Sequence, residues 1–526
     1  MSKKFNLFSI SLLIIYFLAG IFLSLNTGIS HDEYHEQLNW EVNLNSIKDF
    51  FLSGSYDNLL NYRDRYHGIG FNILSQPFQY LIKDLVKIYL DINEYGSILI
   101  SKHILIFILF FISGLFFYYI CMIFFKDKRF ALLSLFIFLL YPYLFGHSHF
   151  NPKDIPFLSF WIICTYFIFK IIQKIFDEKK ISIKLIFFLS LSTSILISIR
   201  IVGLLILLQY LIFLIVYLEN KNKSFIKFIN LYKKNFLAFF FFVILFTYLM
   251  NPIFWHNPQE ILNSVKWMSK YQQDICTVTL GNCMKSLNLP SSYYFIWLFF
   301  KLPIFIILGF ILFPLIEKKL SNNTLNKIFV YSLSISIFLI LILFIIFDVS
   351  IYDEIRHIMF LIPLIFLISL NNLFLLNKKV SSYLGVVVVI FFIFENFSLN
   401  PYQYTWMNSF SKFYNINKNF EVDYWGLSNK NLYKSINRHS LENRSNKKSC
   451  VYGDLYSKVF LENLDFECFK QYSQLDSAKD RPFYVVKNLR NFKRSDPKNC
   501  SLIKMESYKY SFSNQKIKVG SSWYCD

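Results

Sequence analysis

The sequence predicts an all-α polytopic membrane protein, with about eleven crossings and a small C-terminal α/β domain. Three observations lead to this prediction. Of the 526 residues, 55% are hydrophobic, 63 of them Phe, and the mean hydropathy is +0.41. The apolar residues gather in runs close to the roughly 20 residues that a helix needs to span a bilayer. From Asn400 onward the chain is polar and basic, and no further apolar run follows.

Eleven apolar runs are expected to be transmembrane helices. They are Phe5–Leu25, Ile100–Phe125, Phe130–Phe145, Ile155–Ile175, Leu185–Ile199, Ile201–Leu218, Phe236–Met250, Tyr294–Ile316, Ile328–Phe347, Ile358–Leu376 and Tyr383–Leu399. The two runs that flank Arg200 fit either a hairpin of two short helices or one long bent helix. Lys3 and Lys4 precede the first run and no small-residue cleavage site follows it, so this helix is expected to remain as an anchor.

The short loops predict the orientation, because Lys and Arg favour the cytoplasmic side. With the N-terminus inside, every cytoplasmic loop is basic, while the outside segments carry charges of both signs. The inside loops hold Lys126–Arg129, Lys179-Lys180, Lys221–Lys234, Lys318-Lys319 and Lys378-Lys379. The outside segments are Asn26–Ser97, His147–Asp154, the turn at Arg200, Asn251–Tyr293, Asp348–His357 and the tail from Asn400. Residues 1–399 are therefore predicted to form the membrane module, and residues 400–526 an extracytoplasmic domain.

The cysteines agree with this orientation. Cys121 and Cys164 lie within spans, where they are expected to act as small apolar residues. The other six all fall in segments assigned to the outside: Cys276, Cys283, Cys450, Cys468, Cys500 and Cys525. An even number of cysteines outside the cell predicts disulfides. Cys276 and Cys283 can close a small loop, the four in the tail allow three pairings, and no Cys-x-x-Cys spacing supports a zinc site.

The outside segments also predict local structure. The first, long segment mixes apolar and polar residues at helical spacing, so it is expected to form helices along the membrane surface. In the tail, the runs Phe483–Val486, Tyr508–Phe512 and Lys516–Val519 are expected to be strands.

The net charge of +20 raises the possibility of nucleic-acid binding. However, the basic residues are scattered between apolar runs instead of lining one segment, as a nucleic-acid site requires. They are better explained as flanks of membrane spans, and no nucleic-acid partner is expected.

Asp32 and Glu33 belong to a polar stretch, His31-Asp-Glu-Tyr-His-Glu36, that directly follows the first predicted span. Two adjacent carboxyl groups at a membrane surface are suited to orient a nucleophile or to bind a cation. The stretch equally fits a solvated helix start in which Asp32 caps the following turn. Spacing alone leaves both interpretations open.

A short predicted outside loop, Gly146–Pro156, contains four ionisable side chains and two prolines and leads into the next span. His147 and His149, two positions apart, fit either metal ligands or interfacial side chains. Lys153 and Asp154 open the following span. Ionisable groups at a membrane boundary are costly unless they are used or solvated, and this loop is solvated.

Two arginines stand at outer ends of spans. Arg356, followed by His357, fits a snorkelling side chain or, together with Arg200, a grip on a phosphate group. Arg200 is the more unusual, because apolar runs flank it without a neighbouring charge. Two aromatic stretches, Tyr402–Tyr404 and Phe420–Gly426, fit a structural joint at the interface.

In their order and shared sidedness, these motifs resemble the GT-C membrane glycosyltransferases. The similar branch contains protein O-mannosyltransferases, including bacterial dolichyl-phosphate-mannose-protein mannosyltransferases, and the aminoarabinose transferase of lipid A. The resemblance covers most of the membrane region. Its motifs are Asp32-Glu33, Asn151–Pro156, Asn251–Trp255 with Asn257-Pro258, and Arg356-His357. Asp423–Gly426 resembles one bacterial subgroup.

The resemblance implies a polyprenyl-phosphate-sugar donor in the outer leaflet of a bacterial inner membrane, and an envelope acceptor: protein, lipid A or another glycan. Asp32 matches the catalytic carboxylate, Glu33 its neighbour, and Asp154 the acid of the second outside loop. Inverting transfer needs a base behind the anomeric carbon and a cation near the leaving phosphate. Residues expected to bind substrate are Lys153, His147, His149, Arg200, Arg356 and His357. No cofactor is certain, and a divalent metal remains possible because members of the superfamily differ in metal use.

One departure from the family pattern is that His31 and His35 flank the first acid. Two other functions remain as alternatives, a non-catalytic flippase or transporter of lipid-linked glycans and an envelope scaffold. A transporter is expected to place ionisable residues near the middle of its spans. Here they gather at the outer boundary, apart from Arg200, and a scaffold has no need of so many acids and bases on one face.

Overall fold

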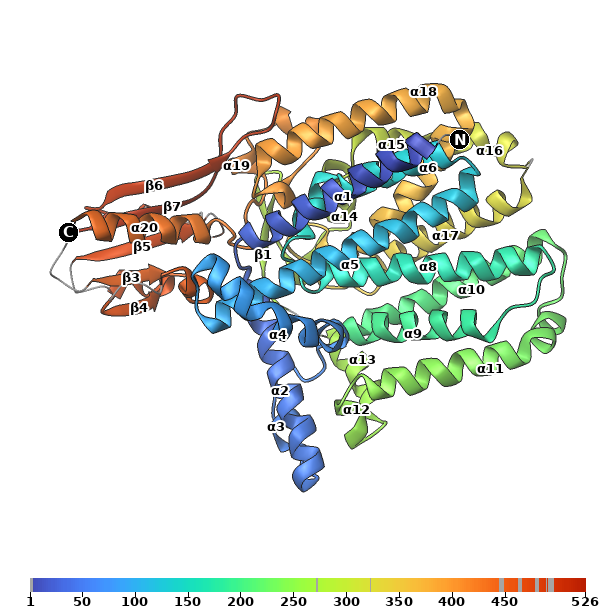
Figure 1. Cartoon of the computed structure of the whole chain (residues 1–526), viewed down its shortest axis with the longest axis horizontal. Helices are drawn as coiled ribbons and strands as arrows, with labels where there is room; N and C mark the ends of the chain where they lie inside the picture. The colour runs from blue at the N-terminus through green and yellow to red at the C-terminus, as the bar shows by residue number, and fades with distance from the viewer. Residues whose placement is uncertain are drawn as a thin grey trace.

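The computed structural model describes residues 3–270, 273–321, 323–443, 449–461, 466–477, 482–488, 490 and 496–526. It is an all-α bundle of membrane-spanning length with a small sheet near the C-terminus (Figure 1). Among these residues, seven helical segments are long and apolar enough to cross a membrane. They are Ser9–Asn26, Glu94–Phe125, Asp154–Phe176, Ile201–Asn220, Phe225–Leu249, Thr324–Ile346 and Arg356–Leu399. The chain is a multi-pass membrane protein.

The expected number of eleven spans is not reproduced, and breaks in the helices explain the difference. An eighth span exists only if α14 (Ser292–Lys301) and α15 (Ile304–Ile311), which are bent by 119°, count as one. The run predicted at 130–145 is two short helices, α6 (Lys128–Leu139) and α7 (Pro142–His147), because Pro142 starts a new helix. The last two predicted runs lie in two helices of the element α18 (Ile362–Leu399), which meet at a kink where the backbone of Asn377 is non-helical.

The segment around Arg200 is a hairpin, which was one of the two expected alternatives. α9 (Ile183–Ile199) ends at Arg200, whose backbone is extended, and a 3-10 turn, Ile201–Leu204, leads into α10 (Leu205–Asn220). The remaining long helices are α1 (Lys3–Asn26), α5 (Glu94–Phe125), α8 (Asp154–Phe176), α11 (Phe225–Leu249), α16 (Phe313–Ser321) and α17 (Thr324–Ile346).

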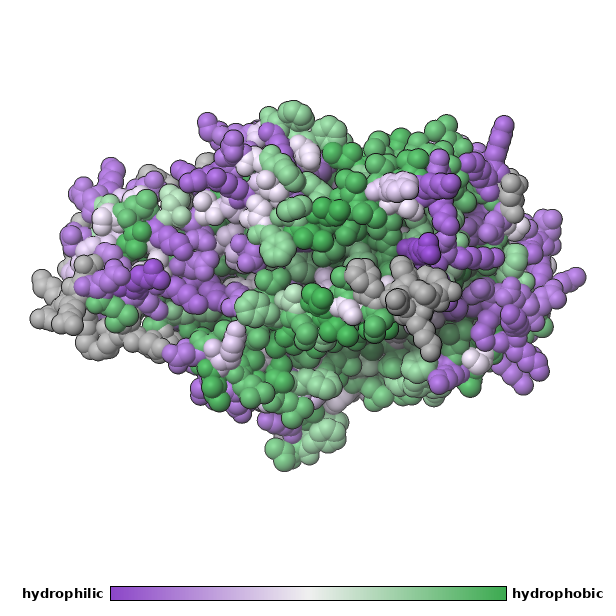
Figure 2. All heavy atoms as spheres, turned by 45° about the horizontal axis from the view of Figure 1, so that its top comes forward, coloured by the Kyte–Doolittle hydropathy of each residue, from purple (hydrophilic) through white to green (hydrophobic). Residues whose placement is uncertain are grey.

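The two ends of the bundle differ in character. Figure 1 shows the N-terminus and the turns α5–α6, α10–α11 and α16–α17 at one end, and the sheet at the other. Figure 2 shows a wide zone of apolar side chains over the bundle, with hydrophilic side chains gathered toward both ends. The short basic turns and the candidate site described below therefore lie at opposite ends.

The first outside segment is helical, as expected. α2 (His31–Ser53), α3 (Asp57–Leu60) and α4 (Gly70–Leu90) follow α1, and α2 runs across the direction of the bundle (Figure 1). Large apolar side chains on α2 and α4 are exposed, including Phe51, Leu52 and Leu81. Helices of this kind lie along a membrane surface.

The C-terminal sheet has five strands in the order β4-β3-β5-β7-β6. Their bounds are β3 (Cys450–Gly453), β4 (Cys468–Gln471), β5 (Phe483–Asn488), β6 (Ser501–Tyr508) and β7 (Ile517–Cys525). β3 pairs in parallel with β4 and β5, whereas β7 is antiparallel to β5 and β6. Two of the three predicted strand runs fall almost wholly within β5 and β7, but the run at 508–512 overlaps β6 only at Tyr508. α20 (Asn429–Asn443) packs against the sheet.

The six cysteines in the segments predicted to lie outside form three disulfides, which confirms the prediction of disulfides. Cys276 pairs with Cys283 across the hairpin of β1 (Cys276–Thr279) and β2 (Asn282–Lys285). In the tail the pairs are Cys450–Cys468, between neighbouring strands, and Cys500–Cys525. Cys121 and Cys164 are free and buried, as expected for residues within spans.

Residues just after α18 pack on the bundle before the chain enters the sheet. Trp406 lies edge-on to Tyr141, with ring centroids 5.4 Å apart, and the Asn408 amide donates to the Leu302 carbonyl at 2.9 Å. The connecting elements are α12 (Ile253–His256), α13 (Glu260–Lys270), α19 (Ile416–Asn419) and 3-10 turns at Ser286–Asn288, Arg356–Leu361, Gln403–Thr405, Ser409–Phe413, Leu455–Phe460 and Tyr472–Ser477. A domain boundary at residue 400 stays a prediction.

Candidate active site

The first two turns of α2 present carboxylates on two different faces. Asp32 and Glu36, four residues apart, lie on one face, and Glu33 and Gln37 lie on the other. The Asp32–Glu36 face meets cationic side chains from other helix ends, as detailed below. This division means that the two adjacent acids, Asp32 and Glu33, have different surroundings.

Asp32 pairs with Arg356, which follows the loop before α18. Its Oδ2 accepts a hydrogen bond from Arg356 Nη1 at 2.9 Å. The Asp32 side chain is 37% exposed, whereas that of Arg356 is 4% exposed. Burial alone would raise the pKa of Asp32, but Arg356, with Lys153 and Arg200 nearby, lowers this pKa below its ordinary value. Asp32 is therefore an ionised carboxylate that is open to water at neutral pH.

Arg356 is held by three carboxylates and two aromatic rings. Besides Asp32, its terminal nitrogens lie 3.9 Å from Asp154 Oδ2 and 3.8 Å from Asp353 Oδ2. The guanidinium carbon lies 4.7 Å from the ring centroid of Tyr352 and 4.6 Å from that of Trp425. Contacts with ring faces and carboxylates fix the plane of the guanidinium.

Asp154 begins α8 and is paired with the second arginine. Arg200 Nη2 lies 2.5 Å from Asp154 Oδ1, and the Asp154 side chain is 1% exposed. The Asn151 side chain orients this acid, since its Nδ2 donates to Asp154 Oδ2 at 2.9 Å and its Oδ1 accepts from the Asp154 N–H at 2.8 Å. A carboxylate in the first turn of a helix is also favoured by the helix dipole.

Lys153 completes the group by reaching the second carboxylate on α2. Its Nζ lies 2.6 Å from Glu36 Oε1, and both side chains are largely buried. Seven side chains thus form one network, which we call the polar centre. Its members are Asp32, Glu36, Lys153, Asp154, Arg200, Asp353 and Arg356. They come from four helix ends that the linear sequence keeps far apart.

Glu33 lies outside the polar centre, with its side chain only 1% exposed. One oxygen accepts a hydrogen bond from the Ser30 N–H at 2.6 Å, and the other lies 2.6 Å from His103 Nε2 on α5. Glu33, and not Asp32, therefore binds the backbone at the start of α2, so the capping role that was one of the two interpretations of Asp32 falls to Glu33. Its contacts suit a residue that positions the helix, while its predicted catalytic role stays a prediction.

The histidines expected to bind substrate are not members of the polar centre. His147 is buried, with ring nitrogens near Asn151 and, at 3.5 Å, the Tyr424 hydroxyl, and burial lowers its pKa well below the ordinary value. His149 is buried between helices, with Nδ1 2.9 Å from Ser24 Oγ of α1. His357 is half-buried beside the Tyr352 ring. These contacts join helices and loops to one another.

The aromatic stretch at 420–426 proves to be both a joint and a neighbour of the polar centre. Asp423 is buried and accepts hydrogen bonds from the Tyr404 hydroxyl and from the N–H groups of Leu427 and Ser428. Burial raises the pKa of Asp423 to about 6. Trp425, two residues later, covers one face of the Arg356 guanidinium. The sequence predicted only a structural role for this stretch, and not the contact between Trp425 and Arg356.

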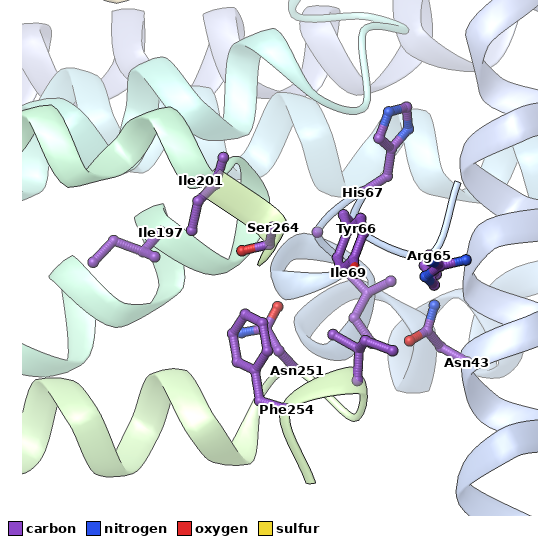
Figure 3. A pocket seen from close by; sticks show the side chains of 12 residues that line it. Asn43, Arg65, Tyr66, His67, Ile69, Ile197, Ile201, Asn251, Phe254 and Ser264 are labelled. Carbon is purple, nitrogen blue, oxygen red and sulfur yellow. The ribbon is translucent and has the colours of Figure 1, made fainter. Parts of the chain in front are cut away.

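A small pocket beside the α9–α10 turn is shown in Figure 3. Its walls include His67, Ile201 and Asn251, and the Asn251 amide donates to Ser198 Oγ at 2.8 Å. The volume of about 20 Å³ holds about one water molecule. This pocket is therefore too small for a sugar or a phosphate.

Metal binding was left open by the sequence. Within the part of the chain that the structure describes, no group of three or more His, Cys, Asp or Glu side chains is arranged to hold a metal ion. In the polar centre, the four carboxylates are paired with two guanidinium groups and one ammonium group, which are side chains that also bind phosphate oxygens in proteins.

Several contributors to the site were not selected from the sequence. Glu36 ends the stretch His31–Glu36 and Asp353 lies in the segment Asp348–His357, but neither had an assigned role. Arg490, in the tail, donates to Asp353 Oδ1 at 2.8 Å and to the Tyr424 carbonyl at 2.9 Å. Nothing in the residues around Arg490 indicates this contact, because it depends on how the tail packs against the bundle.

Two crystal structures of ArnT from Cupriavidus metallidurans are similar to this chain over almost its entire length. The structure bound to undecaprenyl phosphate aligns with 99% of this chain and 98% of its own, at 11% identity and a TM-score of 0.47. The apo structure aligns over the same shares at 11% identity and a TM-score of 0.46. No protein-family model and no curated protein matches the sequence.

Proposed function

We propose that the protein is a GT-C-type glycosyltransferase that moves a sugar from a polyprenyl-phosphate donor to a hydroxyl group of an envelope acceptor. The observation that carries the proposal is the polar centre. Within it Asp32, a carboxylate that is 37% exposed, lies beside Arg356 and on the side where Arg200 and Lys153 converge. A base next to several cations is what transfer from a phosphate requires.

In the proposed reaction Asp32 orients the acceptor hydroxyl and takes its proton. The acceptor oxygen forms a bond to the anomeric carbon as the bond from that carbon to the phosphate oxygen breaks. The electron pair of the broken bond stays on the phosphate, which leaves as polyprenyl monophosphate with one more negative charge. Attack in line with the departing phosphate inverts the anomeric configuration.

The cations are proposed to bind the donor phosphate. Arginine suits a phosphate because its planar guanidinium donates several parallel hydrogen bonds. Arg356 Nε is buried and has no hydrogen-bond partner among the described residues, so this arginine keeps a donor for a ligand. When phosphate draws Arg356 away from Asp32, the Asp32 carboxylate becomes a stronger base, and donor binding prepares the proton transfer.

The proposed location is the outer leaflet of a bacterial inner membrane, with the N-terminus in the cytoplasm. The polar centre lies at the same end of the bundle as the sheet and its two disulfides, which are stable in an oxidising compartment (Figure 1). The basic turns lie at the other end, in agreement with the preference of Lys and Arg for the cytoplasmic side. A membrane lipid and an envelope acceptor are thus the proposed partners.

The transporter alternative is disfavoured by the positions of the ionisable side chains in the spans. Lys102 and His103 fall in the first third of α5, and Glu395 is close to the end of α18. All three lie near the end of the bundle that carries the polar centre. A transporter would be expected to keep such groups near the middle of the membrane.

The proposal is tested in cells by mass spectrometry of surface glycans. A strain without this protein is expected to lack one glycan modification, which the parental gene restores and Asp32→Asn does not. Asp127→Asn, in a turn at the opposite end of the bundle, is the matched control and should restore it. Restoration by Asp32→Asn at equal protein level would contradict the proposal.

A further inference from the structure

A second pocket lies between the start of α2 and the C-terminal sheet. Its volume of about 270 Å³ is close to the lower end of small-molecule sites, which occupy roughly 300–1,000 Å³. Most of the residues that line it have polar side chains. The lining residues used below are His31, Asn429, Asp454, Gln471, Asn488 and Arg490. Its size suits one ring-sized group and excludes a lipid chain or a folded partner.

The sheet topology explains why a pocket forms here. β3 lies between β4 and β5, and all three strands are parallel. From β3 the chain passes to β4 on one side and then crosses to β5 on the other side. This change of direction opens a crevice at the carboxyl ends of the three strands. Gly453 ends β3, Gln471 ends β4 and Asn488 ends β5, and all three line the pocket.

The polar side chains of the pocket are held in place by one another. Asp454 Oδ1 lies 3.5 Å from His31 Nδ1, and Asp454 Oδ2 accepts hydrogen bonds from Asn429 Nδ2 at 3.2 Å and from Ser457 Oγ at 2.8 Å. Arg490 is fixed by its hydrogen bonds to Asp353 and to the Tyr424 carbonyl. Such side chains are arranged in advance for a ligand, which lowers the entropy cost of binding.

The pocket adjoins the polar centre through two connections. His31 and Asp32 are consecutive residues in the first turn of α2, where neighbouring side chains diverge, one to Asp454 and the other to Arg356. Asp353 lies between the two sites, 2.8 Å from Arg490 and 3.8 Å from Arg356. The pocket therefore adjoins the polar centre through His31 and Asp353, while the Asp32 side chain lies on the polar-centre side of this boundary.

We propose that this pocket binds a saccharide ring of the acceptor and so directs one of the acceptor's hydroxyl groups toward Asp32. This inference rests on the proposed function and narrows its acceptor to a glycan or glycolipid. Carboxylate, amide, imidazole and guanidinium groups together match the mixed donors and acceptors of a polyhydroxylated ring. Because Asp454 and Arg490 have opposite charges, a strongly charged ligand of either sign would meet repulsion.

Gly426 supports this assignment by leaving room at one wall. Its φ is +73°, and a Cβ there would lie 2.9 Å from His31 Nε2, 3.0 Å from Asn429 Nδ2 and 3.4 Å from Asn488 Nδ2. Any side chain at this position would crowd the three polar groups. A glycine is therefore required both by the backbone conformation and by the space between these groups.

The test measures saccharide binding by the detergent-solubilised full chain. The probes are neutral methyl glycosides of glucose, galactose, mannose, heptose and N-acetylglucosamine, detected by saturation-transfer NMR. At least one should bind, and Asn488→Ala and Gln471→Ala should each weaken it about fivefold, the effect of one lost hydrogen bond. Lys504→Gln, on edge strand β6, is the matched control and should bind as the parent does.

The outcomes separate this inference from the proposed function. Asp32→Asn should bind the glycoside normally while losing transfer, and the two pocket variants should raise the acceptor KM and leave the donor KM unchanged. Failure of every glycoside to bind, or equal binding by the parent and both pocket variants, would overturn the saccharide assignment. Transfer at the parental rate by Asp32→Asn would instead overturn the proposed function, whatever the binding result.

Discussion

The open Asp32–Arg356 pair of the polar centre contrasts with closed ion pairs elsewhere at the same end of the bundle. Asp32 and Arg356 form a pair whose carboxylate is 37% exposed. In the pairs Glu33–His103 and Lys301–Glu354, by contrast, no side chain is more than 1% exposed. The adjacent acids Asp32 and Glu33 thus belong to two kinds of pair, one open to water and one closed to it.

The difference teaches that access to water, and not charge alone, separates a candidate reactive group from a structural one. A closed pair has no room for a substrate between its partners. Burial raises the pKa of Glu354 to about 8, so this acid gives up much of its charge in the closed setting. Asp32 keeps its charge and faces water, as a reacting carboxylate must.

The largest effect is expected from removing the shared cation. Arg356→Ala leaves Asp32, Asp154 and Asp353 without their common partner, and breaking a buried pair on one side costs about 3–5 kcal/mol. We expect a lower unfolding midpoint in detergent and loss of sugar transfer. Arg356→Lys should recover part of the stability. An unchanged midpoint in Arg356→Ala would show that the network does not stabilise the fold.

Arg200→Ala is expected to have the next largest effect, and on one substrate more than the other. If Arg200 binds the donor phosphate, its loss removes charge-assisted hydrogen bonds of about 1.5–3 kcal/mol, roughly a 10- to 100-fold loss of donor affinity. Acceptor affinity should change much less. Separate titrations of the two substrates measure this, and equal losses for both would argue against a phosphate site.

Glu33→Gln tests whether Glu33 is structural, in contrast to the adjacent Asp32. Glutamine still accepts a hydrogen bond from the Ser30 N–H, but the charged contact with His103 is lost. We expect about 1–3 kcal/mol of destabilisation, with turnover per folded molecule close to the parental value. Thermal unfolding and turnover of the same preparation test this. A large loss of turnover at unchanged stability would support the catalytic role predicted from the sequence.

The kcat/KM for the donor, which reports the donor-free protein, should depend little on Asp32 protonation between pH 5 and pH 7, because in that state the pKa of Asp32 is held below its ordinary value. The stability that Asp32 contributes is fully present above the unfolded pKa of about 3.9 and disappears as pH falls through the lower folded pKa. A pH–rate profile of the parent measures the acid limb. A limb centred above about pH 6 would show that a different group acts as the base.

The smallest effect is expected at the opposite end of the bundle, where Lys378 pairs with Asp127 in a turn. The Lys378 side chain is 53% exposed, and exposed pairs contribute about 0–1 kcal/mol. Lys378→Ala should therefore leave both the unfolding midpoint and the transfer rate nearly unchanged. A strong loss of transfer would mean that this end of the protein also takes part in function.

The sequence predicted the membrane fold and part of the site from local signals. Apolar run length predicts the spans, and the acids and arginines at their outer ends are conspicuous. The number of eleven spans is not confirmed one for one, because Pro142, Pro303 and Asn377 lie at breaks in helices, and run length does not show such breaks.

The different roles of neighbouring residues in the site could not be predicted from the sequence. Asp32 and Glu33 are adjacent, and only the packing of α2 against α5 decides which acid is buried with His103. Likewise His31 had no expected role, because Asp454 is 423 residues away and reaches it only through the docking of the sheet. Contacts of this kind depend on tertiary packing, which the spacing of residues in the sequence does not predict.

The central claim is tested most directly by release of polyprenyl phosphate from a lipid-linked sugar by the purified protein in lipid nanodiscs, in the presence of acceptor. The account predicts that Asp32→Asn lowers this rate by about 100-fold or more, since a positioned base contributes roughly 10²–10⁴-fold, with only a small fall in the unfolding midpoint because Asn can still accept the hydrogen bond from Arg356. Release by a well-folded Asp32→Asn protein at the parental rate would contradict it.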